Sequence, residues 1–367
     1  MDVTLLHFAN VRLGAGFPTL GARGRDQRAQ LVATLDSLAD LAMAENVNAV
    51  LISGDLFGCP VPAPNTLKSV QAFFTRLRDS AVPVILHPGS RDPRSLFDLH
   101  HQADSHDYLG GAIVLDSLHP VAALEGLELV FQQVNLSDPA SFPVAKDTSP
   151  KHQSLVIGVA CHDGDQSLDL SALADAFSGA AIRYLAVGGD LTFSVHAARD
   201  LTVCSPGVPE PLEWGQEEGS VALVRISNGK VRVDRGRTGT RSFARRDLEL
   251  TLSTARDVIS LIAAQAHEDL GLEVILRGKC PGYVLIDPAS IESELAARFF
   301  NLRVVDRTEL VIDAGEQSDL PKGTVLGNFV RVMDERIRGA NDGEQRIHER
   351  EAYRLGMGLL QGEGAPS

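Results

Sequence analysis

The sequence predicts an α/β protein, and three observations favour this fold class. Between Met1 and Asp92, short apolar runs alternate with amphipathic stretches in the order strand, turn, helix. Each of the three strands in this region is followed by polar residues, as expected where the carboxyl ends of parallel strands meet at one rim of a sheet. Hydrophobic residues make up 44% of the 367 residues, which is ordinary for a globular chain with more than one core.

The stretch from Ala49 to Pro60, AVLISGDLFGCP, organises this region. Its apolar run predicts a buried parallel strand, and Asp55 follows at the carboxyl tip. A carboxylate there has two interpretations: it caps the following helix, or it binds a metal ion together with residues from neighbouring strands. Both interpretations remain open on this stretch alone.

Neighbouring strands deliver further polar side chains to the same rim. The strand predicted over Val3 to Phe8 is followed by Asn10 and Arg12. The strand predicted over Val82 to His87 is followed by three polar residues, Ser90, Arg91 and Asp92. We therefore expect these side chains to lie near Asp55, where the two guanidinium groups can pair with the carboxylate.

These motifs resemble those of the calcineurin-like metallophosphoesterases, and within them the SbcD/Mre DNA repair exonucleases and their YhaO-type relatives. The resemblance rests on the three strand-end motifs, a later strand-end histidine and a proline-rich segment: Asn10 to Gly14 (NVRLG), Gly54 to Gly58 (GDLFG), Gly89 to Asp92 (GSRD), His162, and Ser205 to Glu213 (SPGVPEPLE). It implies a four-layer αββα metallophosphoesterase sandwich with a small α+β capping domain and a C-terminal helical tail. The expected division is residues 1–240, 241–315 and 316–367.

The elements follow this plan along the chain. Leucines spaced by three and four predict a helix from Arg25 to Asn46, and a similar pattern predicts one from Asn65 to Ser80. Asn228-Gly229 predicts a hairpin turn that closes the first domain. After Arg241, alternating strands and helices indicate the second domain, in which Asp287-Pro288 begins a helix. The tail carries a helical apolar stripe, then a glycine-rich break, then a second helix.

The resemblance implies a centre of two divalent ions, usually manganese, and this chain departs from it. Asp55 and His162 match family ligands, and Asn10 offers one neutral oxygen in place of a carboxylate. Arg12 stands in place of a ligating histidine, and a guanidinium cannot bind a metal ion. Ser90 replaces a ligating asparagine and Arg91 replaces the catalytic histidine, so no catalytic residue is assigned. The residual metal set is Asp55, His162 and Asn10; the phosphate-binding set is Arg12, Arg91 and Ser90.

Three functional hypotheses follow. The first is a catalytically inactive subunit, a pseudo-nuclease that acts as scaffold or regulator with an SMC-like coiled-coil ATPase in DNA double-strand break repair. The second is an active metal-dependent phosphodiesterase or exonuclease with a reduced metal site. The third is a phosphate or nucleotide sensor that uses Arg12 and Arg91. The partner surface expected for the first hypothesis is Leu326, Phe329, Val330, Met333, Leu355 and Leu359.

Charge and composition set further expectations. The formal net charge of −14 opposes direct binding to DNA, so we expect DNA contact through the complex. No apolar run reaches the roughly 20 residues of a membrane span, and no signal peptide precedes the first strand, which predicts a cytoplasmic protein without membrane contact. The four cysteines are scattered and form no zinc motif. The sequence leaves open whether the chain forms a homodimer.

Overall fold

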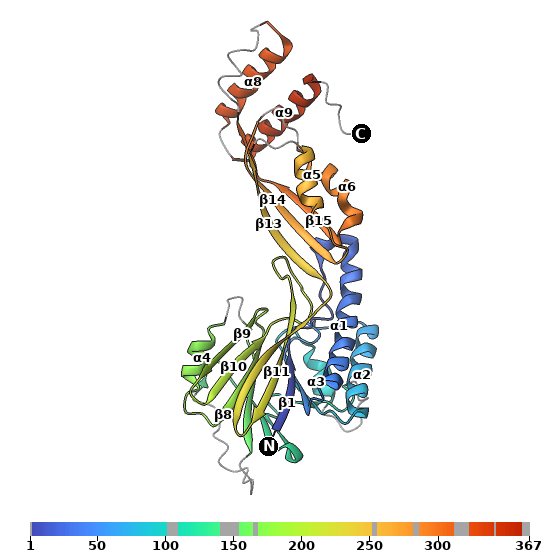
Figure 1. The fold of residues 1–367 in the computed structure, drawn as a ribbon, viewed down its shortest axis with the longest axis vertical. Helices are drawn as coiled ribbons and strands as arrows, with labels where there is room; N and C mark the ends of the chain where they lie inside the picture. The colour runs from blue at the N-terminus through green and yellow to red at the C-terminus, as the bar shows by residue number, and fades with distance from the viewer. Residues whose placement is uncertain are drawn as a thin grey trace. The chain divides into compact units, whose positions relative to one another are not determined.

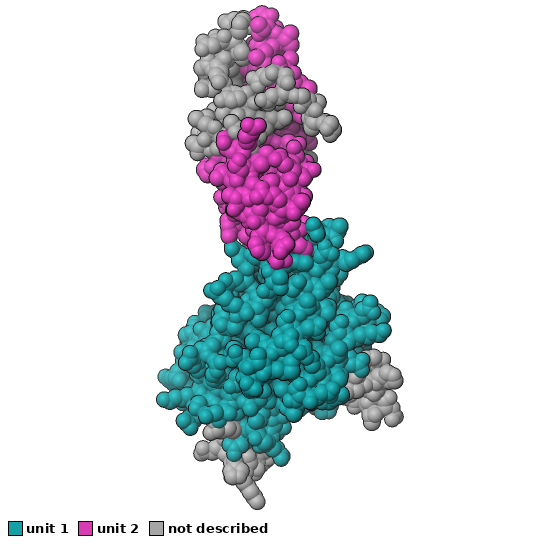
Figure 2. All heavy atoms as spheres, turned by 45° about the vertical axis from the view of Figure 1, so that its right-hand side comes forward, with its two compact units in different colours: residues 1–212, 216–242 teal, residues 213–215, 243–367 magenta. Residues whose placement is uncertain are grey.

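The computed structural model describes residues 2–100, 109–139, 154–163, 168–251, 255–281, 286–311, 323–340 and 343–361. The chain forms two compact units (Figure 2). Unit 1 comprises Met1–Leu212 and Gln216–Ser242, and unit 2 comprises Glu213–Gly215 and Phe243–Ser367. The division into residues 1–240, 241–315 and 316–367 stays a prediction, and its second boundary lies outside the described residues.

Unit 1 contains a first sheet of six strands in the order β12-β11-β1-β2-β3-β4. The neighbouring strands β1 to β4 are parallel, and β11 and β12 add an antiparallel edge, so the sheet is mixed. Phe8 of β1 lies opposite Ile52 of β2, and Ser53 of β2 lies opposite His87 of β3, so three carboxyl ends reach one rim. The bounds are β1 (Asp2–Phe8), β2 (Ala49–Ser53), β3 (Val84–His87), β4 (Ile113–Val114), β11 (Gly219–Ser227) and β12 (Lys230–Thr238).

A second mixed sheet of unit 1 has the order β5-β6-β7-β8-β10-β9. Its inner strands β6, β7, β8 and β10 are parallel, and antiparallel strands close both edges. The bounds are β5 (Val121–Leu124), β6 (Leu129–Gln133), β7 (Leu155–Cys161), β8 (Ile182–Gly188), β9 (Phe193–Ala198) and β10 (Leu201–Pro206). With the first sheet, this confirms the prediction of a mixed α/β protein with two sheets.

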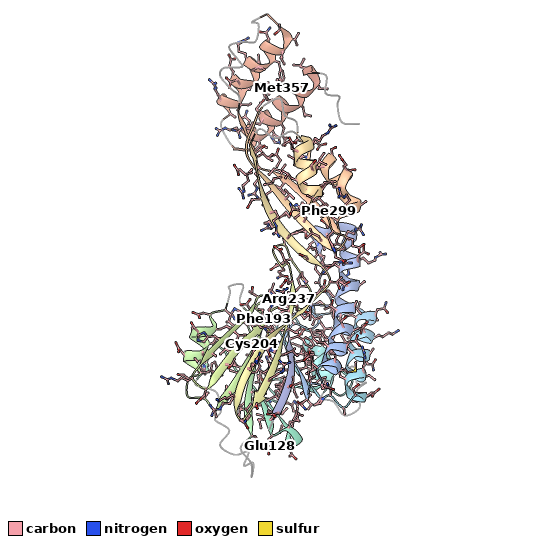
Figure 3. The ribbon with its side chains drawn as sticks, in the orientation of Figure 1. Glu128, Phe193, Cys204, Arg237, Phe299 and Met357 are labelled. Atoms are coloured by element: carbon pink, nitrogen blue, oxygen red, sulfur yellow. The ribbon has the colours of Figure 1, made fainter. Side chains whose placement is uncertain are left out.

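The two sheets of unit 1 pack against each other. Their shared core joins Leu5 and Leu51 of the first sheet to Phe131 and Ile157 of the second. Cys204 of β10, labelled in Figure 3, lies in the same core. In Figure 1 the helices near β1 lie on one side of the two sheets and α4 lies on the other. The bounds are η1 (Pro18–Arg23), α1 (Gly24–Ala44), α2 (Pro64–Asp79), α3 (Arg94–His100), η2 (Glu125–Leu127) and α4 (Leu170–Ala176).

Unit 2 contains a sheet in the order β13-β14-β15, with β16 paired to β14. Val258 of α5 and Ile291 of α6 pack with Leu272 and Val274 of β14, and Phe299 (Figure 3) belongs to the same core. The predicted cap at Asp287 is present, because its carboxylate accepts a hydrogen bond from the backbone N–H of Ala289 at 3.1 Å. The bounds are β13 (Ser242–Thr251), α5 (Ala255–Ala263), β14 (Leu270–Pro281), α6 (Pro288–Leu295), η4 (Ala296–Arg298), β15 (Asn301–Asp306) and β16 (Glu309–Val311).

The tail forms a helical hairpin of α8 (Val325–Gly339) and α9 (Gly343–Gln361). Its core joins Val330, Met333 and Ile337 of α8 to Tyr353 and Met357 of α9, the last labelled in Figure 3. The expectation that Val330 and Met333 face a partner is corrected: each is only 4% exposed because the second helix covers it. No helix among the described residues combines the length and apolar character needed to cross a lipid bilayer.

Three polar side chains centred on His7 are joined by hydrogen bonds in the core of unit 1. Its Nδ1 lies 2.7 Å from the hydroxyl of Tyr184 in β8, and its Nε2 lies 2.8 Å from the hydroxyl of Ser53. Both ring nitrogens therefore have partners, which allows a neutral imidazole to lie in the core without an unsatisfied polar atom. Burial lowers the pKa of His7 from 6.5 to about 3.

We predict that His7 makes unit 1 sensitive to acid. Below pH 6.5 the unfolded chain binds a proton at His7 that the folded chain binds only near pH 3, so stability falls as the pH falls. Between about pH 7.5 and about pH 5 this term should lower the free energy of unfolding by about 2 kcal/mol. Urea unfolding at both pH values should show this loss in the wild type but not in His7→Gln. Ser53→Ala keeps the imidazole and should retain the wild-type pH dependence. If the free energy of unfolding changes with pH to the same extent in wild type and in His7→Gln, the assignment to His7 is contradicted.

Candidate functional site

Three loops meet at the rim where β1, β2 and β3 end. The loop after β1 runs beside the loop after β2, because the N–H of Asn10 donates to the carbonyl of Gly54 at 3.0 Å, and that of Arg12 to the carbonyl of Asp55 at 3.0 Å. The N–H of Gly14 continues this ladder to Phe57 at 2.8 Å. Asn10, Arg12 and Asp55 have φ values of 56°, 50° and 51°. Such left-handed backbone is uncommon outside glycine and is concentrated at functional sites.

Asp55 is fully buried at the centre of this rim and is paired with two cations. Its Oδ2 lies 3.1 Å from Nη2 of Arg12 and 3.0 Å from Nη1 of Arg91. The Arg12 side chain is 17% exposed and that of Arg91 is 42% exposed. Two neighbouring loops thus each place a permanent cation on one oxygen of a buried carboxylate, which offsets the cost of removing that charge from water.

The other oxygen of Asp55 is packed against the loop after β3. A Cβ added to Gly89 would lie 2.2 Å from Asp55 Oδ1, so only glycine leaves room for this carboxylate. Among the described residues, Oδ1 has no hydrogen-bond partner. The two oxygens of Asp55 therefore differ: one is held by two guanidinium groups, and the other is enclosed by backbone.

Asp92 fastens the loop after β2 to the loop after β3. Its carboxylate accepts the backbone N–H groups of Leu56, Phe57, Gly58 and Gly89 at 3.2, 2.8, 3.2 and 2.9 Å. Burial raises the pKa of Asp92, and the amide donors act in the opposite direction. Sequence analysis placed Asp92 at the rim but missed this role, because nothing in a single motif shows which backbone amides point toward it.

Asn10 fastens the loop after β1 to the second sheet. Its Nδ2 donates to the carbonyls of Asp190 and Gly207 at 2.8 and 3.0 Å, and its Oδ1 accepts the N–H of Gly189 at 3.1 Å. The use of Asn10 as a metal ligand stays a prediction; in this structure its oxygen accepts one backbone N–H and its amide nitrogen donates to two carbonyls.

His162 follows β7, and its backbone N–H donates to the carbonyl of Gly188 at 2.8 Å. Together with Ser90, it lines a cavity of about 730 Å³. Arg94 also lines this cavity, as do three aspartates, Asp98, Asp116 and Asp163. The structure therefore places Arg12 and Arg91 on Asp55, and places Ser90 and His162 together along the neighbouring cavity.

The residues present do not fit a two-metal centre. Oδ2 of Asp55 is paired with two guanidinium groups, and the oxygen of Asn10 accepts a hydrogen bond from a backbone N–H. Among the described residues, no group of three or more histidine, cysteine, aspartate and glutamate side chains is arranged to hold a metal ion. Burial and the charge of Asp55 raise the pKa of the nearby Cys161 thiol, which keeps it protonated and unsuited to nucleophilic attack.

Comparison with known proteins gives one sequence relative. No family model matches the chain. A stretch of 90 residues, 24% of the chain, is 31% identical to the DNA double-strand break repair protein Mre11 of Saccharolobus solfataricus. The match spans only 23% of the length of that protein.

Solved structures give weaker likenesses. They include GAP50, the anchor in the inner membrane complex of Plasmodium (13% identity, TM-score 0.40, covering 64% of this chain and 84% of that one). A novel archaeal phosphodiesterase matches at 12% identity and TM-score 0.35, covering 64% of this chain and 99% of that one. A predicted phosphoesterase of Streptococcus pneumoniae matches at 12% identity and TM-score 0.30, covering 64% and 89%. TM-scores this low do not establish a shared fold.

Over these 90 residues the chain is similar to a protein of the nuclease group that its strand-end motifs resemble. Within that group its sequence match is to Mre11, of which the chain is a distant homologue over these 90 residues. This match over 90 residues confirms the predicted resemblance to the SbcD/Mre proteins.

We predict that Asp92→Asn destabilises unit 1 by about 2 to 4 kcal/mol, because the new amide group would point N–H donors at backbone N–H donors. Urea unfolding at neutral pH measures the loss. Asp98→Asn makes the same change at an exposed position of α3 and should stay within about 0.5 kcal/mol of wild type. Equal effects of the two substitutions would show that the four hydrogen bonds from backbone N–H groups to Asp92 make no specific contribution to the stability of unit 1.

Proposed function

We propose that this protein is a non-catalytic relative of the SbcD/Mre nucleases, with a metallophosphoesterase-type sandwich and a capping domain that serve as scaffold or regulator in DNA-end processing. One observation carries the proposal: Arg12 and Arg91 are both paired with the carboxylate of Asp55. In-line phosphodiester hydrolysis by this class needs two metal ions that activate water and neutralise the phosphate. Two permanent guanidinium cations at Oδ2 of Asp55 repel such ions and provide no ligand for them.

The proposed partner is an SMC-like coiled-coil ATPase in the cytoplasm, bound through the hairpin of α8 and α9. Leu355 and Leu359 of α9 are 51% and 61% exposed and lie four residues apart, so they share one face of the helix. Leu326 and Phe329 are partly buried in the hairpin. The net charge of −14 supports DNA contact through the partner rather than through this chain.

The two alternatives differ in how the site supports them. An active phosphodiesterase would need manganese held by Asn10, Asp55 and His162. The hydrogen bonds between the Asn10 side chain and backbone groups of the second sheet count against this use of Asn10. A phosphate or nucleotide sensor is favoured by one feature: the Arg91 side chain is 42% exposed, and Ser90 beside it is exposed. Inorganic phosphate that binds the wild type but not Arg91→Ala would favour this sensor.

We predict no manganese-dependent nuclease or phosphodiesterase activity in the purified full chain. The assay compares wild type with Asp55→Asn on single-stranded and double-stranded DNA and on a chromogenic phosphodiester, each with manganese or EDTA. The two proteins should hydrolyse each substrate at the same background rate. A manganese-dependent rate that exceeds the Asp55→Asn rate by about a hundredfold, the size of effect that charge stabilisation at a reacting centre supplies, would overturn the proposal.

We also predict that the exposed leucines of α9 hold the ATPase. An SMC-like ATPase from the same genome, co-expressed with the full chain, should co-purify with wild type and be lost with Leu355→Ser/Leu359→Ser. Ile347→Ser is the matched control, because Ile347 is an apolar residue of the same helix that is 58% exposed. Because all three positions are exposed, the hairpin core of Val330, Met333 and Tyr353 should remain folded by circular dichroism. Equal co-purification of all three proteins would contradict the assignment.

A further inference from the structure

The Arg12, Asp55 and Arg91 side chains come from three different loops and meet at one atom. Arg12 follows β1, Asp55 follows β2 and Arg91 follows β3, and both guanidinium groups lie within 3.1 Å of Asp55 Oδ2. The resemblance matches Asp55 to a metal ligand of the SbcD/Mre nucleases. Here the same carboxylate bridges two cations that are covalently part of the chain.

The surroundings of the cluster fit this role. Asp55 is fully buried, so its charge must be compensated inside the protein. Gly58 has a φ of 62°, and a Cβ there would lie 2.8 Å from Cβ of Arg12, so the loop after β2 is shaped to admit the arginine. Gly89 is packed against Asp55 Oδ1 in the same way. Asp92 adds a second buried carboxylate, so the rim holds two cations and two acidic groups.

We propose that Arg12 and Arg91 are a built-in substitute for the metal centre. The two guanidinium groups neutralise Asp55, hold the three loops together and close the bridging oxygen to divalent cations. The rim is consequently ordered without metal, and removing the two arginines leaves the charge of Asp55 uncompensated and the three loops less firmly held. This inference rests on the geometry of the cluster and does not require the proposed scaffold role.

The test is the melting temperature of the full chain, measured by calorimetry with manganese or with EDTA in excess. Wild type should melt at the same temperature in both, within about 1 °C. Arg12→Ala/Arg91→Ala should melt about 10 °C lower in EDTA, because a buried carboxylate has lost its partners. Manganese should not change the melting temperature of wild type, because Oδ2 of Asp55 is already paired with both guanidinium groups.

Arg183→Ala is the matched control. Arg183 pairs with Asp200 at 3.0 Å and its side chain is 44% exposed, close to the 42% of Arg91, but Asp200 itself is 84% exposed. This control should melt within about 2 °C of wild type and should not respond to manganese. A manganese-dependent rise in wild type, or a double variant that melts within about 2 °C of Arg183→Ala, overturns the inference.

A second measurement applies where the double variant does not fold. Arg91→Ala alone should speed hydrogen exchange at the backbone amides of Arg12 and Gly14 by about tenfold, because the loop after β2, whose carbonyls accept these amides, loses its tie to the loop after β3. Arg183→Ala should leave these amides unchanged, and equal exchange in both variants overturns the inference. An inactive, manganese-insensitive wild type whose double variant is as stable as Arg183→Ala removes this inference and leaves the proposed function standing. Manganese-dependent hydrolysis by wild type removes the proposed function.

Discussion

The structure of the rim depends on one requirement: the buried charge of Asp55 has to be compensated. A carboxylate without water around it is costly unless cations or donors lie against it. In this chain the compensation comes from Arg12 and Arg91, and the distances of 3.1 and 3.0 Å to a single oxygen show how closely the loops approach. The backbone is left-handed at both Arg12 and Asp55, a conformation that is uncommon outside glycine and concentrated at functional sites.

Much of the fold can be predicted from the sequence because it depends on local patterns. The strand ending at Ser53, the leucine stripe of α1 and the cap at Asp287 each appear within a few neighbouring residues. The pairing of Arg12 and Arg91 with Asp55 is also predictable, because parallel strands bring their carboxyl ends to one rim. Local patterns do not predict the strand order, since it depends on pairings such as that of β1 with β11, which lie more than two hundred residues apart.

The features that sequence reasoning missed all involve long-range contacts. The amide of Asn10 bonds to Gly189, Asp190 and Gly207, about 180 to 200 residues later, and no motif records such partners. His7 is one more residue of a strand in the sequence, and only the fold places Tyr184 and Ser53 beside it. The apolar stripe of α8 predicted a buried face correctly, but a stripe does not say what covers it. In the structure α9 covers this face, and the ring of Phe329 stacks on that of Tyr353 with 6.0 Å between the ring centroids.

The side-chain hydrogen bonds of Asn10 disfavour an aspartate at this position. An aspartate at position 10, as in the resembled nucleases, would set a negative oxygen against the carbonyls of Asp190 and Gly207, where the amide now donates. Removing Arg12 first would strip a buried anion of half its compensation. Each of these single substitutions toward the motifs of the resembled nucleases therefore gives a less stable protein, so selection for stability alone favours the present residues.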